Sequence, residues 1–313
     1  MPAATASAAE PFAHTPFDGT KKPFTVALAQ LDLVDWIEPD RDLARTLAQR
    51  GALLRDKRDV VFREEPGTRA AQREVLDLVV AHVLEHFPEQ YHRDGSRVTV
   101  RPAGLTLDLD DPDEAPLVLA GRLVSDDLLI LRPSEAGYRL VAAVLCFPSA
   151  WSLAEKFGAT LDGLHANVPG YPGKMAMVMN RIFDHLKVEQ PVWRVNWSIY
   201  PDAELHHPES KERPRDWFDD PANLAPEAFV RVERQTLRRL PVSGDVLFGI
   251  RVHVDPFDAF RRHPDGGRLA ASLREQILGL NAEQLAYKGL TQHRDAIARA
   301  LEIVALEAAE ASV

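Results

Sequence analysis

Apolar and polar residues alternate with a helical period at both ends of the chain and with a strand period between them. Apolar residues recur at helical spacing in four stretches, which cover residues 41–50, 68–87, 268–280 and 295–309. Asp40 is the predicted N-cap of the first helix. The second helix begins at Thr68 and stops before Pro88. The sequence therefore predicts helices on either side of a central region of strands.

The central region predicts a sheet. Leu105, Leu107 and Leu109 alternate with polar residues, as in a half-buried strand. Further strands are predicted at residues 123–131, 138–147, 192–200, 230–240 and 246–254, and shorter helices at residues 151–157 and 173–186. Runs of strands joined by loops predict an α+β fold on an antiparallel sheet. No GxGxxG, P-loop or GxSxG sequence follows a strand, which argues against a dinucleotide-binding fold and a serine hydrolase.

The last three predicted strands carry polar residues at alternating positions. Side chains of one parity in strand 192–200 are Arg194, Asn196 and Ser198, opposite the apolar set Trp193, Val195, Trp197 and Ile199. In strand 230–240 one parity holds Arg234, Thr236 and Arg238 and the other Glu233, Gln235 and Arg239; in strand 246–254 Gly249, Arg251 and His253 oppose five apolar residues. We expect one sheet face to pack a core. The polar face is then either a solvent face or the lining of a polar pocket.

Composition restricts the classes of partner. The 313 residues carry a net charge of −10 with a pI near 5.6, which argues against nucleic acid or an anionic membrane as partner. No run reaches the roughly 18–20 apolar residues of a membrane span. The one cysteine, Cys146, excludes an intramolecular disulfide and favours a reducing, cytoplasmic location. CxxCH is absent, which excludes a covalently attached c-type haem.

Three segments are predicted along the chain. Residues 1–23, rich in Ala, Ser, Thr and Pro, predict a flexible tail. Residues 24–263 hold the strands and the first helices and form the main α+β domain. Residues 264–313 predict a helical segment packed on the same domain, which either lies across the sheet or forms a surface for a homo-oligomer.

The stretch 138–171 leads to a single histidine in a rigid, mostly apolar loop. His165 follows a predicted strand, a break at residues 147–149 and a short helix, and it is flanked by Leu164 and by the Val-Pro-Gly-Tyr sequence of residues 168–171. A neutral imidazole on a fixed backbone is what an axial metal or haem ligand requires. The alternative is a packing or hydrogen-bonded loop histidine.

The other histidine pairs give weaker indications of a site. His82 and His86 are four residues apart on a predicted helix but have no third ligand nearby in sequence, so we expect them on the surface. His206 and His207 are adjacent, and successive side chains of an extended chain point apart, so a surface loop is predicted for them.

Five sequence blocks occur in an order that is similar to a known family. The blocks are CFPSAW, EKFG, LHANVPGY, WRVNWSIYP and ERQTLRRLP, within a region from about residue 36 to residue 257. The chain resembles the haem-dependent oxidative N-demethylase family. The resemblance implies that a PAS-like domain binds haem b without a covalent link.

The resemblance also implies roles for individual residues. His165 would be the axial ligand of the haem iron. Haem propionates require cations, for which the candidates are Arg194, Arg234, Arg238 and Arg239, with Lys174 behind them. Glu233 is the candidate base, and Glu233, Tyr171 and Trp197 could surround a cationic amine.

The implied reaction is the oxidation of a small methylated amine to an imine, which hydrolyses to the demethylated amine and formaldehyde. The chain has no cysteine cluster and no flavin fingerprint, so it would need a separate redox partner. The resemblance implies that this partner is a flavin/iron–sulfur reductase. Two alternatives remain: a non-catalytic haem-binding sensor or carrier on the same PAS-like scaffold, and a haem-free interaction module.

Overall fold

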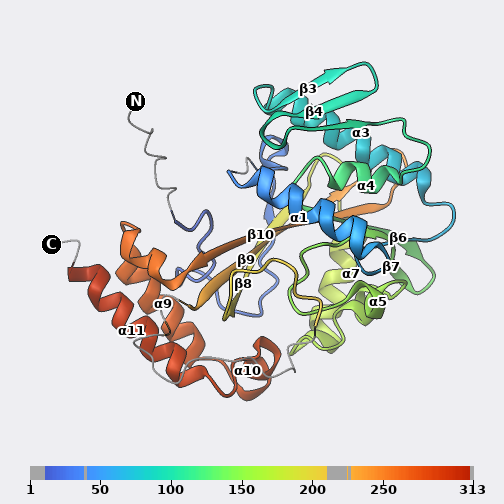
Figure 1. The fold of residues 1–313 in the computed structure, drawn as a ribbon. Helices are drawn as coiled ribbons and strands as arrows, with labels where there is room; N and C mark the ends of the chain where they lie inside the picture. Colours follow the sequence, from blue (N-terminus) through green and yellow to red (C-terminus); the bar gives the residue numbers. More distant parts are fainter. Residues whose placement is uncertain (1–10, 39–40, 210–223, 225–226, 311–313) are drawn as a thin grey trace, which may run out of the picture.

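Seven strands form one antiparallel sheet, as seen in a computed structural model that describes residues 11–38, 41–209, 224 and 227–310 (Figure 1). Its strands are β1 (Ala29–Gln30), β2 (Phe62–Glu64), β6 (Asp127–Ser134), β7 (Gly137–Val144), β8 (Val192–Tyr200), β9 (Phe229–Arg239) and β10 (Val246–Pro256). The order across the sheet is β1-β8-β9-β10-β6-β7-β2, and all neighbours are antiparallel. The predicted α+β class is confirmed.

The N-terminal part contributes helices and a small second sheet. The helices are η1 (Leu33–Asp35), α1 (Leu43–Asp56), α2 (Arg58–Val61), α3 (Arg69–His86), η2 (Arg101–Ala103) and α4 (Pro116–Gly121). Strands β3 (Tyr91–Asp94), β4 (Arg97–Val100) and β5 (Leu105–Asp108) form a separate three-stranded sheet. Helix α3 follows Thr68 and ends before Pro88, as predicted, whereas the predicted N-cap Asp40 lies outside the described residues.

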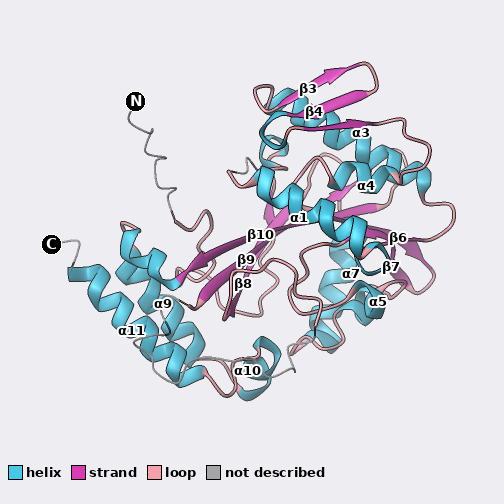
Figure 2. Cartoon of the chain, in the orientation of Figure 1, coloured by secondary structure: helices cyan, strands magenta, loops and turns pink. Residues whose placement is uncertain are grey.

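The remaining helices fall into two groups, one on each side of the long strands (Figure 2). Between β7 and β8 lie α5 (Leu153–Lys156), α6 (Leu161–Leu164), the π-helical turn η3 (Tyr171–Met175) and α7 (Ala176–His185). After β10 come η4 (Phe257–Arg262), α9 (Gly266–Leu278), α10 (Ala282–Lys288) and α11 (Arg294–Glu310). Helix α10, which lies between the two helices predicted near the C-terminus, begins with a capping box at Asn281.

The strand predicted at residues 123–131 begins later, at Asp127, because the preceding residues bind a buried arginine. The Nη2 atom of Arg50 donates to the carbonyl oxygens of Ser125 and Asp126, both at 3.0 Å. Its Nη1 atom donates to Asp127 at 2.8 Å, and both side chains of that pair are fully buried. The carboxylate of Asp127 also accepts the backbone N–H groups of Cys146 and Phe147. These bonds hold α1 against the start of β6 and the end of β7.

The register of β8, β9 and β10 mixes polar and apolar residues on both faces of the sheet. Opposed residues share a face, and Arg194 lies opposite Gln235, which lies opposite Ile250. We call this side the front face; it also holds Asn196, Glu233, Leu237, Phe248 and Val252. The back face holds Trp193, Trp197, Arg234, Thr236, Arg238, Arg251 and His253. The prediction of one apolar and one polar face is wrong, because alternation within a strand does not determine the register between strands.

Two of the three apolar clusters lie on opposite faces of the long strands. Helices α9 and α11 pack on the back face, where Leu273 and Leu301 join Trp197 and Val232. On the front face α6, η3 and α7 pack against the end of β9 near Leu237, through the buried residues Leu161, Tyr171, Met179, Phe183 and Leu186. The half-buried residues Arg194, Glu233 and Gln235 lie on this face, beyond Leu237 along the sheet. Among the described residues, no helix is long and apolar enough to cross a membrane.

The described part of the segment predicted as a tail packs against the C-terminal helices. Phe12 and Phe17 are buried, and both rings contact Phe260 of η4, with centroids 4.4 Å and 5.8 Å away. Residues 1–10 of the predicted tail lie outside the described residues.

Candidate functional site

His165 directly follows helix α6 as its C-cap residue, and a hydrogen bond holds its ring in one tautomer. Thr160 caps the helix by accepting the backbone N–H of Gly163 at 3.3 Å. The Nδ1 atom of His165 lies 2.8 Å from the carbonyl oxygen of Leu161. Because a carbonyl can only accept, Nδ1 carries the proton and Nε2 keeps its lone pair. Metal-bound histidines commonly donate their second ring nitrogen in this way.

The ring of His165 is also fixed by an aromatic neighbour. Tyr171 stacks on it with centroids 4.7 Å apart and planes inclined by 13°. The hydroxyl of Tyr171 donates to Asp162 at 3.3 Å, and Asn180 of α7 donates to the same carboxylate oxygen at 3.2 Å. Gly170 precedes the tyrosine at φ 76°, a left-handed conformation that suits glycine. The sequence therefore places the imidazole against a buried, anchored ring.

Arg194 of β8 brings a half-buried positive charge to the same side of the sheet. Burial lowers the pKa of His165, and the charges of Arg194 and Lys156 lower it further, against the bond to Leu161 and the charge of Asp162. Burial also lowers the pKa of Arg194, while the charge of Glu233 raises it. The Nε atom of Arg194 is buried without a hydrogen-bond partner among the described residues. A neutral imidazole thus lies near a guanidinium that is incompletely hydrogen-bonded.

Glu233 and Gln235 continue this polar patch on β9. The side chain of Gln235 donates to Glu233 at 2.8 Å, and Glu233 lies opposite Asn196. Tyr287 of α10 belongs to the same electrostatic group, because burial and then the charge of Glu233 raise its pKa to about 12. Sequence reasoning missed Tyr287, since nothing in the local pattern of α10 indicates that this helix reaches the front face.

The structure separates the four arginines that the sequence grouped together. Arg234 and Arg238 lie on the back face, where Arg234 binds the carbonyl oxygens of Trp36 and Asp35 and Arg238 stacks on the Trp36 ring at 4.3 Å. Arg239 is on the front face, but it donates to the carbonyl oxygens of Leu186, Phe183 and Gly244. The four arginines therefore do not face a common site, because β9 alternates between faces.

Other residues predicted as candidates also lie away from His165 and Arg194. Lys174 is exposed on η3, and Trp197 is buried in the cluster of the back face. His82 is 7% exposed, so the prediction of a surface position is wrong; it packs beneath Trp36, with ring centroids 5.3 Å apart. His206 is half-buried and bonds to the carbonyl oxygen of Cys146 at 2.8 Å.

The residues that remain together fit a haem. His165 offers an oriented nitrogen lone pair, and Arg194 offers a half-buried cation for a carboxylate such as a propionate. The family model of the haem-dependent oxidative N-demethylase, alpha subunit-like, matches residues 27–298. The chain belongs to this family. The family's description makes haem its cofactor, and the term alpha subunit indicates an assembly of several subunits.

Proposed function

We propose that this member of the family is a haem b-dependent oxidative N-demethylase of a small methylated amine, which it converts to the demethylated amine and formaldehyde. The observation that carries the proposal is the state of His165. Its Nδ1 atom donates to the Leu161 carbonyl, its ring is stacked on Tyr171, and its Nε2 atom keeps a lone pair that can bind iron. The antiparallel sheet with helices inserted between β7 and β8 supports a PAS-like scaffold for this site.

His165 would hold the haem through Nε2 and Arg194 would bind a propionate. When bound, the haem supplies the one-electron redox chemistry that amino-acid side chains lack. The demethylation removes two electrons and two protons from the amine, and water supplies the oxygen of formaldehyde. Because the chain has one cysteine and no flavin fingerprint, a separate flavin/iron–sulfur reductase is the proposed redox partner. Arg239 is less suited to a propionate, since backbone carbonyls already occupy its guanidinium.

Glu233 is the group proposed to bind the amine. Its carboxylate is half-buried on the front face and is held by Gln235. An alkylammonium ion is attracted by a carboxylate and by aromatic rings, and Tyr287 supplies an aromatic side chain close enough to interact electrostatically with Glu233. A carboxylate in this position can also accept a proton as the methyl group is oxidised. Tyr171 acts in this proposal through its contact with His165.

The proposal is tested by absorption spectroscopy and product analysis. The chain is expressed with added haem, purified, and titrated with mono-, di- and trimethylamine while the Soret band is recorded. Formaldehyde release is then measured with an artificial electron acceptor. A Soret band that shifts with one amine, together with formaldehyde release, is expected. A Soret band without either response would favour a sensor or carrier, and no Soret band would favour a haem-free interaction module.

A further inference from the structure

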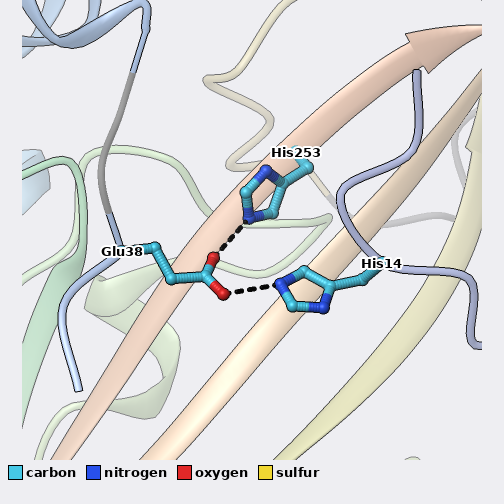
Figure 3. A group of neighbouring side chains, drawn as sticks. All are labelled: His14, Glu38 and His253. Carbon is cyan, nitrogen blue, oxygen red and sulfur yellow. Dashed lines mark hydrogen bonds and ion pairs between the residues drawn. The ribbon is translucent and has the colours of Figure 1, made fainter. Parts of the chain in front are cut away.

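A second group of ligand-type side chains lies on the back face of the sheet. His14 comes from the N-terminal segment, Glu38 from the loop after η1, and His253 from β10 (Figure 3). One ligand atom from each residue lies within 4.8 Å of the other two. The carboxylate accepts from the Nε2 atoms of His14 at 2.7 Å and His253 at 3.1 Å. Three segments distant in sequence thus direct two imidazoles and one carboxylate at one point.

We propose that His14, Glu38 and His253 form a three-ligand site for a divalent first-row transition metal ion, with zinc as the ion that tests it. Two imidazole nitrogens and one carboxylate oxygen are a ligand set that zinc accepts, with a fourth position open to solvent. The ion would replace the two Nε2 protons between the rings and the carboxylate, and each neutral ring would carry its proton on Nδ1. Hard cations such as Mg²⁺ and Ca²⁺ are disfavoured, since they require mostly oxygen ligands.

The burial of the three side chains distinguishes this group from surface residues that meet by chance. The side chains of His14, Glu38 and His253 are 16%, 20% and 17% exposed, so packing restricts the orientation of each. The ring of His14 also packs beside Trp193, with centroids 5.6 Å apart. A groove of about 200 Å³, lined in part by His14, Trp193 and Arg194, borders the group on the side of His14.

Arg234 holds Glu38, the carboxylate ligand, in position. Its Nε atom is ion-paired with Glu38 at 2.9 Å, and its terminal nitrogens bind the carbonyl oxygens of Trp36 and Asp35. The arginine is 2% exposed, so it fixes the loop that presents Glu38. Partners of this kind orient a ligand in metal sites. The positive charge also weakens the attraction for a cation, so we expect zinc to saturate the site at micromolar rather than lower concentrations.

The three proposed metal ligands differ from the residues proposed to hold the haem. Glu38 is ion-paired with Arg234, and both Arg234 and His253 lie on the back face of the sheet. Arg194, beside His165, lies on the front face. Failure of the demethylase proposal would leave the metal site intact. Conversely, zinc binding should not change the intensity of the Soret band.

The test measures zinc binding to the full chain after removal of any affinity tag and treatment with a chelator. Calorimetric titration of the wild type should show one equivalent of zinc, accompanied by a rise in Tm. The variants His14→Gln, Glu38→Gln and His253→Gln should each weaken binding by at least about ten-fold. His92→Gln is the matched control, because His92 is exposed on β3, far from the group in sequence, and should bind as the wild type.

Two results would overturn the proposal: absence of saturable binding to the wild type, or unchanged affinity in the His14 and His253 variants. If the wild type does not bind zinc saturably, the three residues only form hydrogen bonds that join their segments. X-ray absorption at the zinc edge of the wild type provides a readout that does not depend on a variant folding. It should show imidazole scattering with Zn–N distances of about 2.0–2.1 Å, and a shell of oxygen alone would contradict the assignment.

Discussion

The imidazole of His165 lies nearly parallel to the phenol ring of Tyr171, with the two centroids 4.7 Å apart. The tyrosine is 2% exposed and its hydroxyl is bonded to Asp162. The stack and the Leu161 bond together restrict rotation of the histidine ring. This orientation gives the proposed haem ligand a fixed direction before any cofactor binds.

The variant His165→Ala should lose most of its haem, because the only proposed axial nitrogen is removed. The measurement is the ratio of Soret to protein absorbance after expression with added haem. His185→Ala is a matched control: His185 also bonds through Nδ1 to the carbonyl four residues earlier, at 2.9 Å, but lies exposed at the end of α7. A normal haem content in the His165 variant would show that another residue binds the iron.

Two variants of Tyr171 separate a positioning role from a chemical one. Tyr171→Phe keeps the ring against His165 and removes only the bond to Asp162, so haem content and formaldehyde release should stay within about two-fold of the wild type. Tyr171→Ala removes the stack, and the Soret band should weaken or broaden. If the phenylalanine variant instead retained haem and lost formaldehyde release, the hydroxyl would take part in the chemistry.

The variant Arg194→Gln should lower haem affinity by about ten-fold, because a charge-assisted hydrogen bond to a carboxylate contributes about 1.5–3 kcal/mol. Haem transfer to apomyoglobin gives the relative affinities. Arg238→Gln is the matched control on the back face, since Arg238 is also half-buried with an unbonded Nε atom. Equal losses in the two variants would indicate a general effect on the sheet rather than a contact with the propionate.

The variant Asp127→Ala should destabilise the fold by about 3–5 kcal/mol, because it leaves the fully buried guanidinium of Arg50 without its charged partner. It also removes the acceptor of two backbone N–H groups, those of Cys146 and Phe147. Urea unfolding measures the loss. Asp56→Ala, at the exposed ion pair with Arg55, should cost no more than about 1 kcal/mol. Similar losses in both variants would contradict a central role for the buried pair.

Stability should depend on pH through His82. Burial, followed by the charges of His86 and Arg238, lowers the pKa of His82 from 6.5 to about 4. Between these values the unfolded chain binds more protons than the folded one, so the free energy of unfolding falls as the pH drops from 6.5 toward 4, by up to about 3 kcal/mol. Urea unfolding at pH 7, 6 and 5 should show a shallower dependence in His82→Gln than in the wild type. The control His92→Gln should keep the wild-type dependence. An equal pH dependence of the free energy of unfolding in all three proteins would show that His82 is not its source.

Several parts of the fold and of the candidate site follow from local sequence. The bounds of α3 and β8 agree with the predictions, because a helical period ending at Pro88 and a strict alternation over residues 192–200 are set by neighbouring residues alone. The pairing of a rigid loop with a lone histidine also singled out His165. Arg194 and Glu233 were named as candidates and lie on the front face with Gln235.

The tertiary structure decided which of these side chains can act together. Only the strand register shows that Arg234 and Arg238 lie on the opposite face from Arg194, and only the packing of α10 brings Tyr287 to Glu233. The contacts of His14 with Glu38 and of Glu38 with His253 span 24 and 215 residues. Local periodicity determines helices and strands over a few residues. Contacts between distant segments depend instead on how the sheet pairs and on what covers each face, which no local pattern records.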